Sequence, residues 1–203
     1  MEMRGVRGVR LAIAAYLRSE LPGHIEAAQL AWGLTAEELP VPVASSDPRE
    51  DAYFAREVEA LDRWPLIAVA SGRLTSRPSD FTDDFDEVYR SVLPVRVFAW
   101  SRAEGRAQVQ DMRDDFANVV RACLLADPQL GTAGDLLLSP ETMVIDPSRP
   151  DKVKGERWIA GAYIGFDVVV GETLTDRLAH PGQQPRDTVS TVTASAATLI
   201  ADQ

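Results

Sequence analysis

Near the start of the chain, apolar side chains recur at every third or fourth position, which is the spacing of one helix face. This stripe consists of Val9, Ile13, Tyr16, Leu17 and Leu21. It predicts a helix over residues 4–20 that stops at Pro22-Gly23, because proline and glycine oppose helix continuation. A second, short helix is expected around Ile25 to Trp32, followed by extended chain in the proline-rich residues 39–50.

The middle of the chain changes from helical to strand spacing. Phe54, Val58 and Leu61 predict a helix over residues 51–61, and the apolar run 64–70 predicts a buried strand. A longer strand is expected over residues 87–100. Pro94 lies within it, and because proline cannot donate to a ladder, we expect an edge or a bulge at that point.

Residues 103–126 show the strongest helical pattern, in which one face is apolar and the opposite face is polar. The apolar face consists of Val109, Met112, Phe116, Val119, Val120, Cys123 and Leu124. This helix is expected to pack across a sheet. Cys123 belongs to its apolar face and is therefore interpreted as a packing residue.

Two further strands are expected, one over residues 135–146 with an interruption at Ser139-Pro140, and one over residues 156–172. In the second, apolar residues from Trp158 to Val170 share one face. The other face contains Gly161 and Gly165. Glycine weakens a strand, so these glycines indicate close approach by another backbone.

The order of these elements predicts an α+β fold in which one small mixed or antiparallel sheet is flanked by helices. Residues 1–172 are expected to form this domain. Residues 173–203 are rich in Thr, Ser and Ala, and we expect them to form an extended or disordered C-terminal arm.

Composition and charge restrict the function. The net charge is −10, whereas proteins that grip nucleic acid by its phosphates are usually basic. An acidic surface is, however, compatible with DNA that passes without being held. No apolar run reaches the roughly 20 residues that span a bilayer, so no membrane partner is expected.

Local motifs of common enzymes are absent, and no catalytic, cofactor or metal site is predicted. The best candidate for chemistry is the acidic segment from Asp80 to Glu87, which also contains Asp83, Asp84 and Asp86. Closely spaced carboxylates can bind a divalent cation, but this spacing lacks the pattern of a calcium loop. A solvated loop is the preferred interpretation, and a negative lip that faces DNA or a partner is the alternative.

Two other groups of residues are best interpreted as structural. Arg4, Arg7 and Arg10 could form an anion-binding or subunit-contact stripe, although solubility of a surface helix is the simpler interpretation. The four tryptophans, at positions 32, 64, 100 and 158, are expected to anchor the core or an interface.

Three segments together resemble the tail-terminator (tail-completion) proteins of long-tailed phages. They are the entry helix with residues 64–69, residues 89–100 running into residues 110–125, and residues 157–172. The resemblance covers most of residues 1–172 and concerns the pattern and order of elements, because this family has no catalytic motif to match. Residues 39–50 and the C-terminal arm have no counterpart in it.

The resemblance implies a structural virion protein rather than an enzyme. It would form a hexameric ring at the head-proximal end of the tail, stop tube polymerisation, and contact the tail-tube protein and the head connector. DNA would pass through the ring without specific binding. Asp80, Asp83, Asp84, Asp86, Pro94, Gly161 and Gly165 are candidates for the lumen or the interfaces. Assembly would take place in the host cytoplasm.

Three alternatives stay open at this point. The first is another head–tail joining or neck adaptor protein. The second is a metal-dependent hydrolase that uses the acidic loop at residues 80–87. The third is a bacterial protein of unknown role with a similar small sheet, which would remain monomeric.

Overall fold

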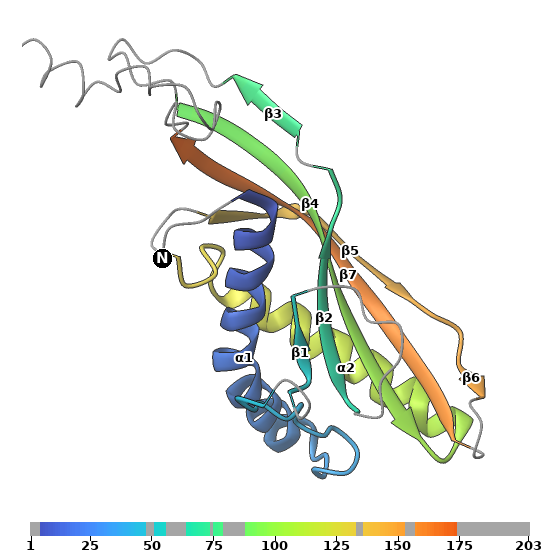
Figure 1. Ribbon diagram of the computed structural model, residues 1–203. Coiled ribbons are helices and arrows are strands. Elements are labelled where there is room, and N and C mark those ends of the chain that lie inside the picture. Colours follow the sequence, from blue (N-terminus) through green and yellow to red (C-terminus); the bar gives the residue numbers. More distant parts are fainter. Residues whose placement is uncertain are drawn as a thin grey trace, which may run out of the picture.

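A computed structural model describes residues 5–47, 51–55, 64–73, 75–78, 88–132, 136–152 and 157–173. These residues form two layers, a twisted sheet and a pair of helices packed on one of its faces (Figure 1). The architecture confirms the predicted α+β class with one small sheet. Among the described residues, neither helix is long and apolar enough to span a bilayer.

The N-terminal helix α1 (Gly5–Trp32) runs through Pro22, so the predicted stop at Pro22-Gly23 is wrong and the two expected helices are one. Proline in a helix interior costs about 3 kcal/mol. The apolar stripe continues across it, however, because Leu21 and Ile25 on either side are both fully buried in the same core. Packing of one continuous face therefore outweighs the local penalty. Trp32, at the end of the helix, is half exposed rather than buried.

The sheet contains seven strands in the order β1-β2-β4-β7-β5, with β3 beside β4 and β6 beside β7. Their bounds are β1 Tyr53–Phe54, β2 Leu66–Ser71, β3 Thr75–Pro78, β4 Val88–Ala103, β5 Leu136–Pro147, β6 Asp151–Lys152 and β7 Trp158–Thr173. Strand β1 pairs with β2 in parallel, and the remaining pairs are antiparallel. The sheet is therefore mixed.

The helix predicted for residues 51–61 is wrong where the structure describes this segment, because Tyr53 and Phe54 form strand β1. Backbone hydrogen bonds fix the extended conformation on both sides of Ala52. Its N–H donates to the Val43 carbonyl at 2.8 Å, and its own carbonyl accepts from Ile67 N–H at 2.8 Å. Segments of the same chain on either side therefore provide the backbone hydrogen-bond partners that a helix would have supplied internally. Residues 56–63 lie outside the described part.

Pro94 is neither on a sheet edge nor in a bulge, contrary to expectation. It lies inside β4, which pairs with β7 in one unbroken register from Val88 to Ala103. On the opposite side of β4, pairing with β2 ends at Val95 and pairing with β3 begins at Val92. The Pro94 carbonyl points to that side, where it accepts from Gly72 N–H at 2.8 Å. The backbone N–H that proline lacks would point to the same side, into the gap between β2 and β3. Proline therefore removes no hydrogen bond of the ladder at this position.

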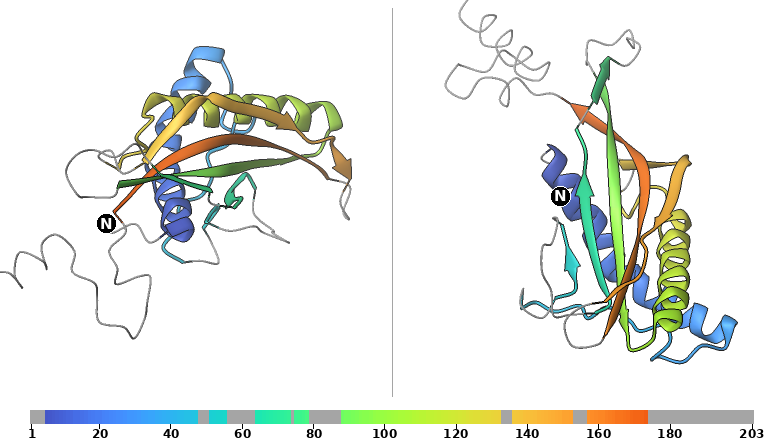
Figure 2. Two further views of the ribbon diagram at one scale, coloured as in Figure 1. Left: turned by 90° about the horizontal axis from the view of Figure 1, so that it is seen from above. Right: turned by 90° about the vertical axis from the view of Figure 1, so that its right-hand side faces the viewer.

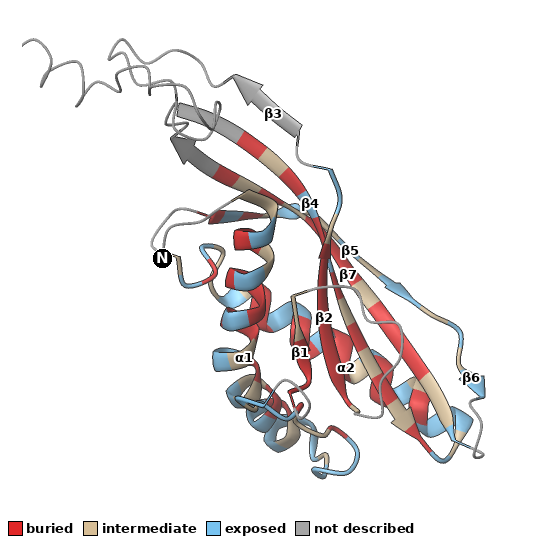
Figure 3. Ribbon diagram, viewed as in Figure 1, coloured by how far each residue is buried: buried red, intermediate tan, exposed pale blue. Residues whose placement is uncertain are grey.

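Helix α2 (Arg106–Ala126) packs beneath β4 and β7 and buries the predicted apolar stripe. It also crosses α1, where the Tyr16 hydroxyl donates to the Cys123 carbonyl at 2.9 Å. Cys123 itself is fully buried, which confirms its predicted packing role. Figure 3 shows that buried residues line the sheet and the helix sides that face it, whereas the outer sides of both helices are exposed.

The last two long strands follow the sequence pattern closely. The alternate residues of β7 from Ala160 to Val170 are buried against the helices, as predicted. The register between β5 and β7 shifts between Ser139 and Val144, which confirms the interruption expected at Ser139-Pro140. Thr173 ends β7, and the arm proposed for the rest of residues 173–203 lies outside the described residues.

Candidate interaction surface on the open sheet face

Strand β4 alternates between two faces of the sheet. Its side chains at positions 93, 95, 97 and 99 are buried against α1 and α2. The intervening side chains belong to the opposite face of the sheet, the one that does not carry the two helices (Figure 2). We call the surface that they form with their neighbours on β5 and β7 the open face. It comprises Pro94, Arg96, Phe98 and Trp100 of β4, Tyr163 of β7, and Leu137, Val144 and Asp146 of β5.

The centre of the open face is a cluster of rings and charges around Tyr163. The ring of Phe98, directly opposite in the register, lies 6.1 Å from the Tyr163 ring at an interplanar angle of 53°. The Arg96 guanidinium carbon lies 5.3 Å from the centre of the same ring, which is the range of a cation–π contact. With Asp146 of β5, the cluster draws on three neighbouring strands, β4, β7 and β5.

Asp146 fixes the polar end of Tyr163. The tyrosine hydroxyl donates to Asp146 Oδ2 at 2.7 Å. This hydrogen bond to the carboxylate raises the pKa of Tyr163, with smaller contributions from burial and from the Asp146 charge. The hydroxyl therefore stays protonated near neutral pH and keeps donating. Arginine, phenylalanine, tyrosine and aspartate are thus held in one defined arrangement.

Trp100 lies flat over Gly161, its partner in the register of β4 and β7. A Cβ atom at position 161 would stand 2.4 Å from Cδ2 of the indole, which is an impossible contact. The group that approaches Gly161 closely is a side chain, so the predicted approach of another backbone is wrong at this position. Gly165 is less crowded, because a Cβ there would meet Val144 Cγ2 at 3.3 Å.

Arginine and tryptophan are paired at two other places along these strands. The Arg102 guanidinium carbon lies 5.9 Å from the Trp64 ring centre, and that of Arg106 lies 5.8 Å from the Trp158 ring centre. Trp158 also packs on a small apolar cluster around Met112 and Val109. The sequence predicted anchoring for all four tryptophans. Trp158 packs on the margin of the core as predicted, whereas Trp32 is half exposed.

The sequence predictions for site residues have mixed outcomes. Pro94 is exposed on the open face, and Gly161 and Gly165 lie beneath side chains of the same face. The candidates Asp80, Asp83, Asp84 and Asp86 lie outside the described residues. Sequence reasoning missed Arg96, Phe98, Tyr163 and Asp146. The alternation Arg96-Val97-Phe98-Ala99-Trp100-Ser101-Arg102 was the signal for the first two.

The open face presents aromatic rings, an arginine and an aspartate. Within the part of the chain that the structure describes, no three His, Cys, Asp or Glu side chains are placed to hold a metal ion. Cys123 is the single cysteine of the chain, and burial raises the pKa of its thiol to about 12, so it is protonated at neutral pH. Aromatic rings and arginine side chains are the groups that protein interfaces concentrate at their centres.

Comparison of the sequence with models of known protein families and with curated proteins finds no match.

Proposed function

We propose that this protein is a structural subunit of a phage tail, of the tail-terminator type, and that it has no catalytic activity. It assembles into a ring, with six subunits as the expected number, at the head-proximal end of the tail. The observation that carries this proposal is the open face, a sheet surface that presents an ordered cluster of arginine and aromatic side chains.

The composition of the open face favours protein contact. Tyrosine, tryptophan, phenylalanine and arginine are the residue types that interfaces concentrate at their centres. Two apolar side chains at the β5 edge, Leu137 and Val144, are 50% and 56% exposed and extend the same surface. A partner protein that covers this face would remove them from water.

The open face is also ordered before it binds. Tyr163 is held by Asp146, Phe98 and Arg96, and Trp100 is held against Gly161. Immobilising a free side chain at an interface costs roughly 0.5–1.5 kcal/mol, and much of that cost is already met here. Such a surface suits repeated assembly of identical subunits onto the end of a tail tube.

The charge of the chain is consistent with this role. At a net charge of −10, most of the surface repels DNA, so DNA can pass through a ring of these subunits without adhering to it. The expected partners are other copies of this chain, the tail-tube protein and the head connector, and the expected location is the virion neck. A related neck adaptor that joins the head would use the same kind of surface.

The first test is the mass of the purified protein in solution, alone and with the tail-tube protein of the same phage, followed by negative-stain imaging. Rings, alone or seated on tube ends, are the expected result. A monomer that ignores tubes would contradict the proposal. Binding to filled heads but not to finished tails would favour the neck adaptor instead.

A charge reversal on the open face tests whether assembly depends on this surface. Arg96→Glu should prevent binding to tube ends or ring formation, whereas Lys152→Glu makes the same charge change at an exposed residue of β6, outside the open face, and should not. If both variants assemble like the natural protein, the open face has no part in assembly.

A further inference from the structure

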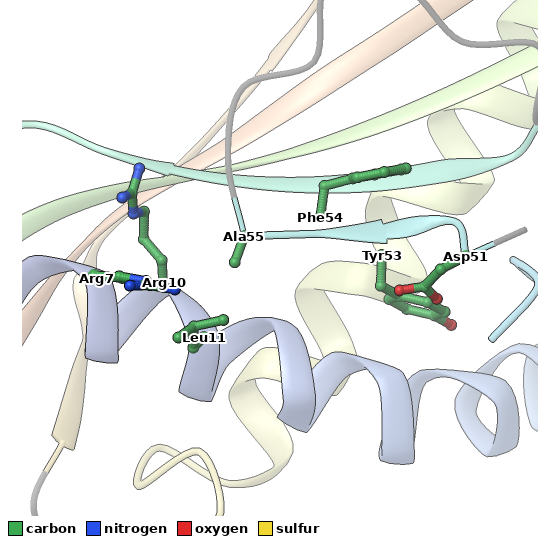
Figure 4. A pocket seen from close by; sticks show the side chains of 7 residues that line it. All are labelled: Arg7, Arg10, Leu11, Asp51, Tyr53, Phe54 and Ala55. Atoms are coloured by element: carbon green, nitrogen blue, oxygen red, sulfur yellow. The ribbon is translucent and has the colours of Figure 1, made fainter. Parts of the chain in front are cut away.

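A cavity of about 370 Å³ lies between α1 and the edge strand β1, on the opposite side of the sheet order from β5 (Figure 4). Arg7 and Arg10 of α1 bring two guanidinium groups to it. Leu11, Phe54 and Ala55 form apolar walls around them. The cavity therefore combines a cationic end with apolar surface, which fits carboxylates presented by the surface of another protein.

Among the described residues, neither Arg7 nor Arg10 forms an ion pair. Arg10 Nε is buried and has no hydrogen-bond partner within the described residues. A buried guanidinium donor without an acceptor is costly, so an acceptor from outside would stabilise it. Asp51 also lines the cavity, but its carboxylate is engaged by Arg18, whose Nη1 lies 3.2 Å from Asp51 Oδ2.

A complementary surface lies on the outer side of α2. Asp111 and Asp115 are one helical turn apart, a spacing at which like charges repel. Between them, Asp114 is held by Arg113 at 2.7 Å, whereas neither Asp111 nor Asp115 is in an ion pair within the described residues. Burial raises the pKa of Asp115, and the charges of Asp111 and Asp114 raise it further. A cation placed here would relieve that repulsion.

The two surfaces lie in different parts of the subunit. The cavity is at the β1 edge of the sheet, whereas α2 packs beneath β4 and β7 (Figure 2). Contact between two different surfaces of identical subunits is heterologous. Repetition of a heterologous contact gives a closed ring or an open filament, whereas a self-complementary patch gives only a dimer.

We propose that the cavity formed by Arg7 and Arg10 receives the Asp111 and Asp115 side chains of a second copy of this chain, and that this contact links neighbouring subunits of the ring. The proposal rests on the proposed ring-forming function and identifies two surfaces that carry it. The planar forks of two arginines match two carboxylates in geometry as well as in charge. In this contact the repulsion between Arg7 and Arg10 on α1, and that between Asp111 and Asp115 on α2, are both reduced by the opposite charge of the neighbour.

The test is a charge exchange between the two surfaces. One variant carries Arg7→Glu and Arg10→Glu, and the other carries Asp111→Arg and Asp115→Arg. Each alone should fail to form rings, because like charges then meet at every contact. An equimolar mixture should form rings, because every contact of an alternating ring is again between opposite charges. Alternation closes only with an even number of subunits, so recovery would also agree with six.

Controls separate this contact from general effects of charge. Glu26→Arg reverses an exposed charge on α1 away from the cavity and should leave rings unchanged. Circular dichroism verifies that each variant is folded. If a double reversal does not fold, Arg7→Gln with Arg10→Gln removes charge without reversing it. That pair should raise the concentration needed for half-assembly at least about tenfold.

The outcomes distinguish the two proposals. If the natural protein forms rings and both reversed variants also form them alone, the cavity is not the contact, and the ring function stands. Reversed variants that fail alone and also fail when mixed would show that their charges do not face each other. If the natural protein forms no ring even with tube protein, the proposed function fails and the contact with it.

Discussion

The indole ring of Trp100 rests on the backbone of β7 at Gly161, so closely that a Cβ atom at position 161 would stand 2.4 Å from indole Cδ2. Trp100 is the register partner of Gly161 across the longest strand pair of the sheet. A glycine in the middle of a strand normally weakens it. Here it creates the recess that holds a large aromatic side chain flat on the open face.

Gly161→Ala should therefore destabilise the fold, by about 1–3 kcal/mol, because the indole must leave its position. Gly165→Ala is the matched control on the same strand face. Its added Cβ would stand 3.3 Å from the Val144 Cγ2 methyl and 3.8 Å from Tyr163 Cε2, neither of them an impossible contact, so a smaller loss is expected. Urea unfolding of both variants measures the difference. Trp100→Ala should remove most of the penalty of Gly161→Ala, and simple additivity of the two changes would contradict the contact.

Two glycines, one inside α1 and one directly after it, should respond to alanine in opposite directions. Gly23 lies inside α1 with no heavy atom within 4 Å of an added Cβ, so Gly23→Ala should stabilise the protein by roughly 0.5–1 kcal/mol. Gly33 follows the helix at a φ of +69°, where a side chain is strained, so Gly33→Ala should destabilise it. Thermal unfolding of the pair tests the prediction, and equal shifts of the same sign would refute it.

Arg113 is expected to matter for stability more than any ordinary surface arginine. Its Nη1 donates to the Ser148 carbonyl at 2.6 Å, and Ser148 N–H in turn donates to the Gly161 carbonyl at 2.7 Å. Arg113 itself is buried, and Arg113→Ala leaves the half-buried Ser148 carbonyl without this donor, so the change should cost about 1–3 kcal/mol. Arg121→Ala, an exposed arginine of the same helix, should change the unfolding free energy by less than about 0.5 kcal/mol. Equal losses in the two variants would argue against a role for this hydrogen bond.

Stability should fall at alkaline pH through the contact between α1 and α2. Burial raises the pKa of the Cys123 thiol from 9.0 to about 12, and burial likewise raises the pKa of the Tyr16 hydroxyl from 10.0 to about 12. Both groups then bind protons more tightly in the folded state. Their contribution is complete below pH 9 and is lost as the pH rises from about 9 to 12.

Urea unfolding at pH 7.5, 9 and 10.5 measures this loss. Cys123→Ala should lower stability at pH 7.5, because it leaves a cavity, and should reduce the dependence on pH. Tyr16→Phe should reduce the same dependence by removing one of the two titrating groups, although it also removes the hydrogen bond by which Tyr16 lowers the pKa of the Cys123 thiol. An unchanged slope in both variants would show that neither group causes the alkaline loss.

Several features of the fold follow from the sequence because they depend on local periodicity. The buried stripe of α2 and the alternation of β7 from Ala160 to Val170 are visible in the chain and recur in the structure. The interruption of β5 at Ser139 is also visible in the chain, because Pro140 follows it and proline cannot donate to a sheet ladder. These patterns require only that one side of each element meets a core.

The open face could be predicted only in part. Arg96 and Phe98 alternate with buried residues, so their outward direction is readable from the chain. Their neighbours Tyr163 and Asp146 come from strands far away in sequence, and only the register of β4, β7 and β5 brings the four together. Periodicity predicts the direction of a side chain but not its neighbours across the sheet.

The sequence by itself determined the fold class, the two principal helical faces and the buried side of β7, because hydrophobic spacing states which side of each element avoids water. Only the tertiary structure decided that α1 continues through Pro22, that residues 53–54 form a strand, and that Pro94 occupies a break between β2 and β3. Each of these depends on contacts between distant segments. Packing and hydrogen bonds supplied by those segments outweigh the local preferences of proline and of a short apolar repeat.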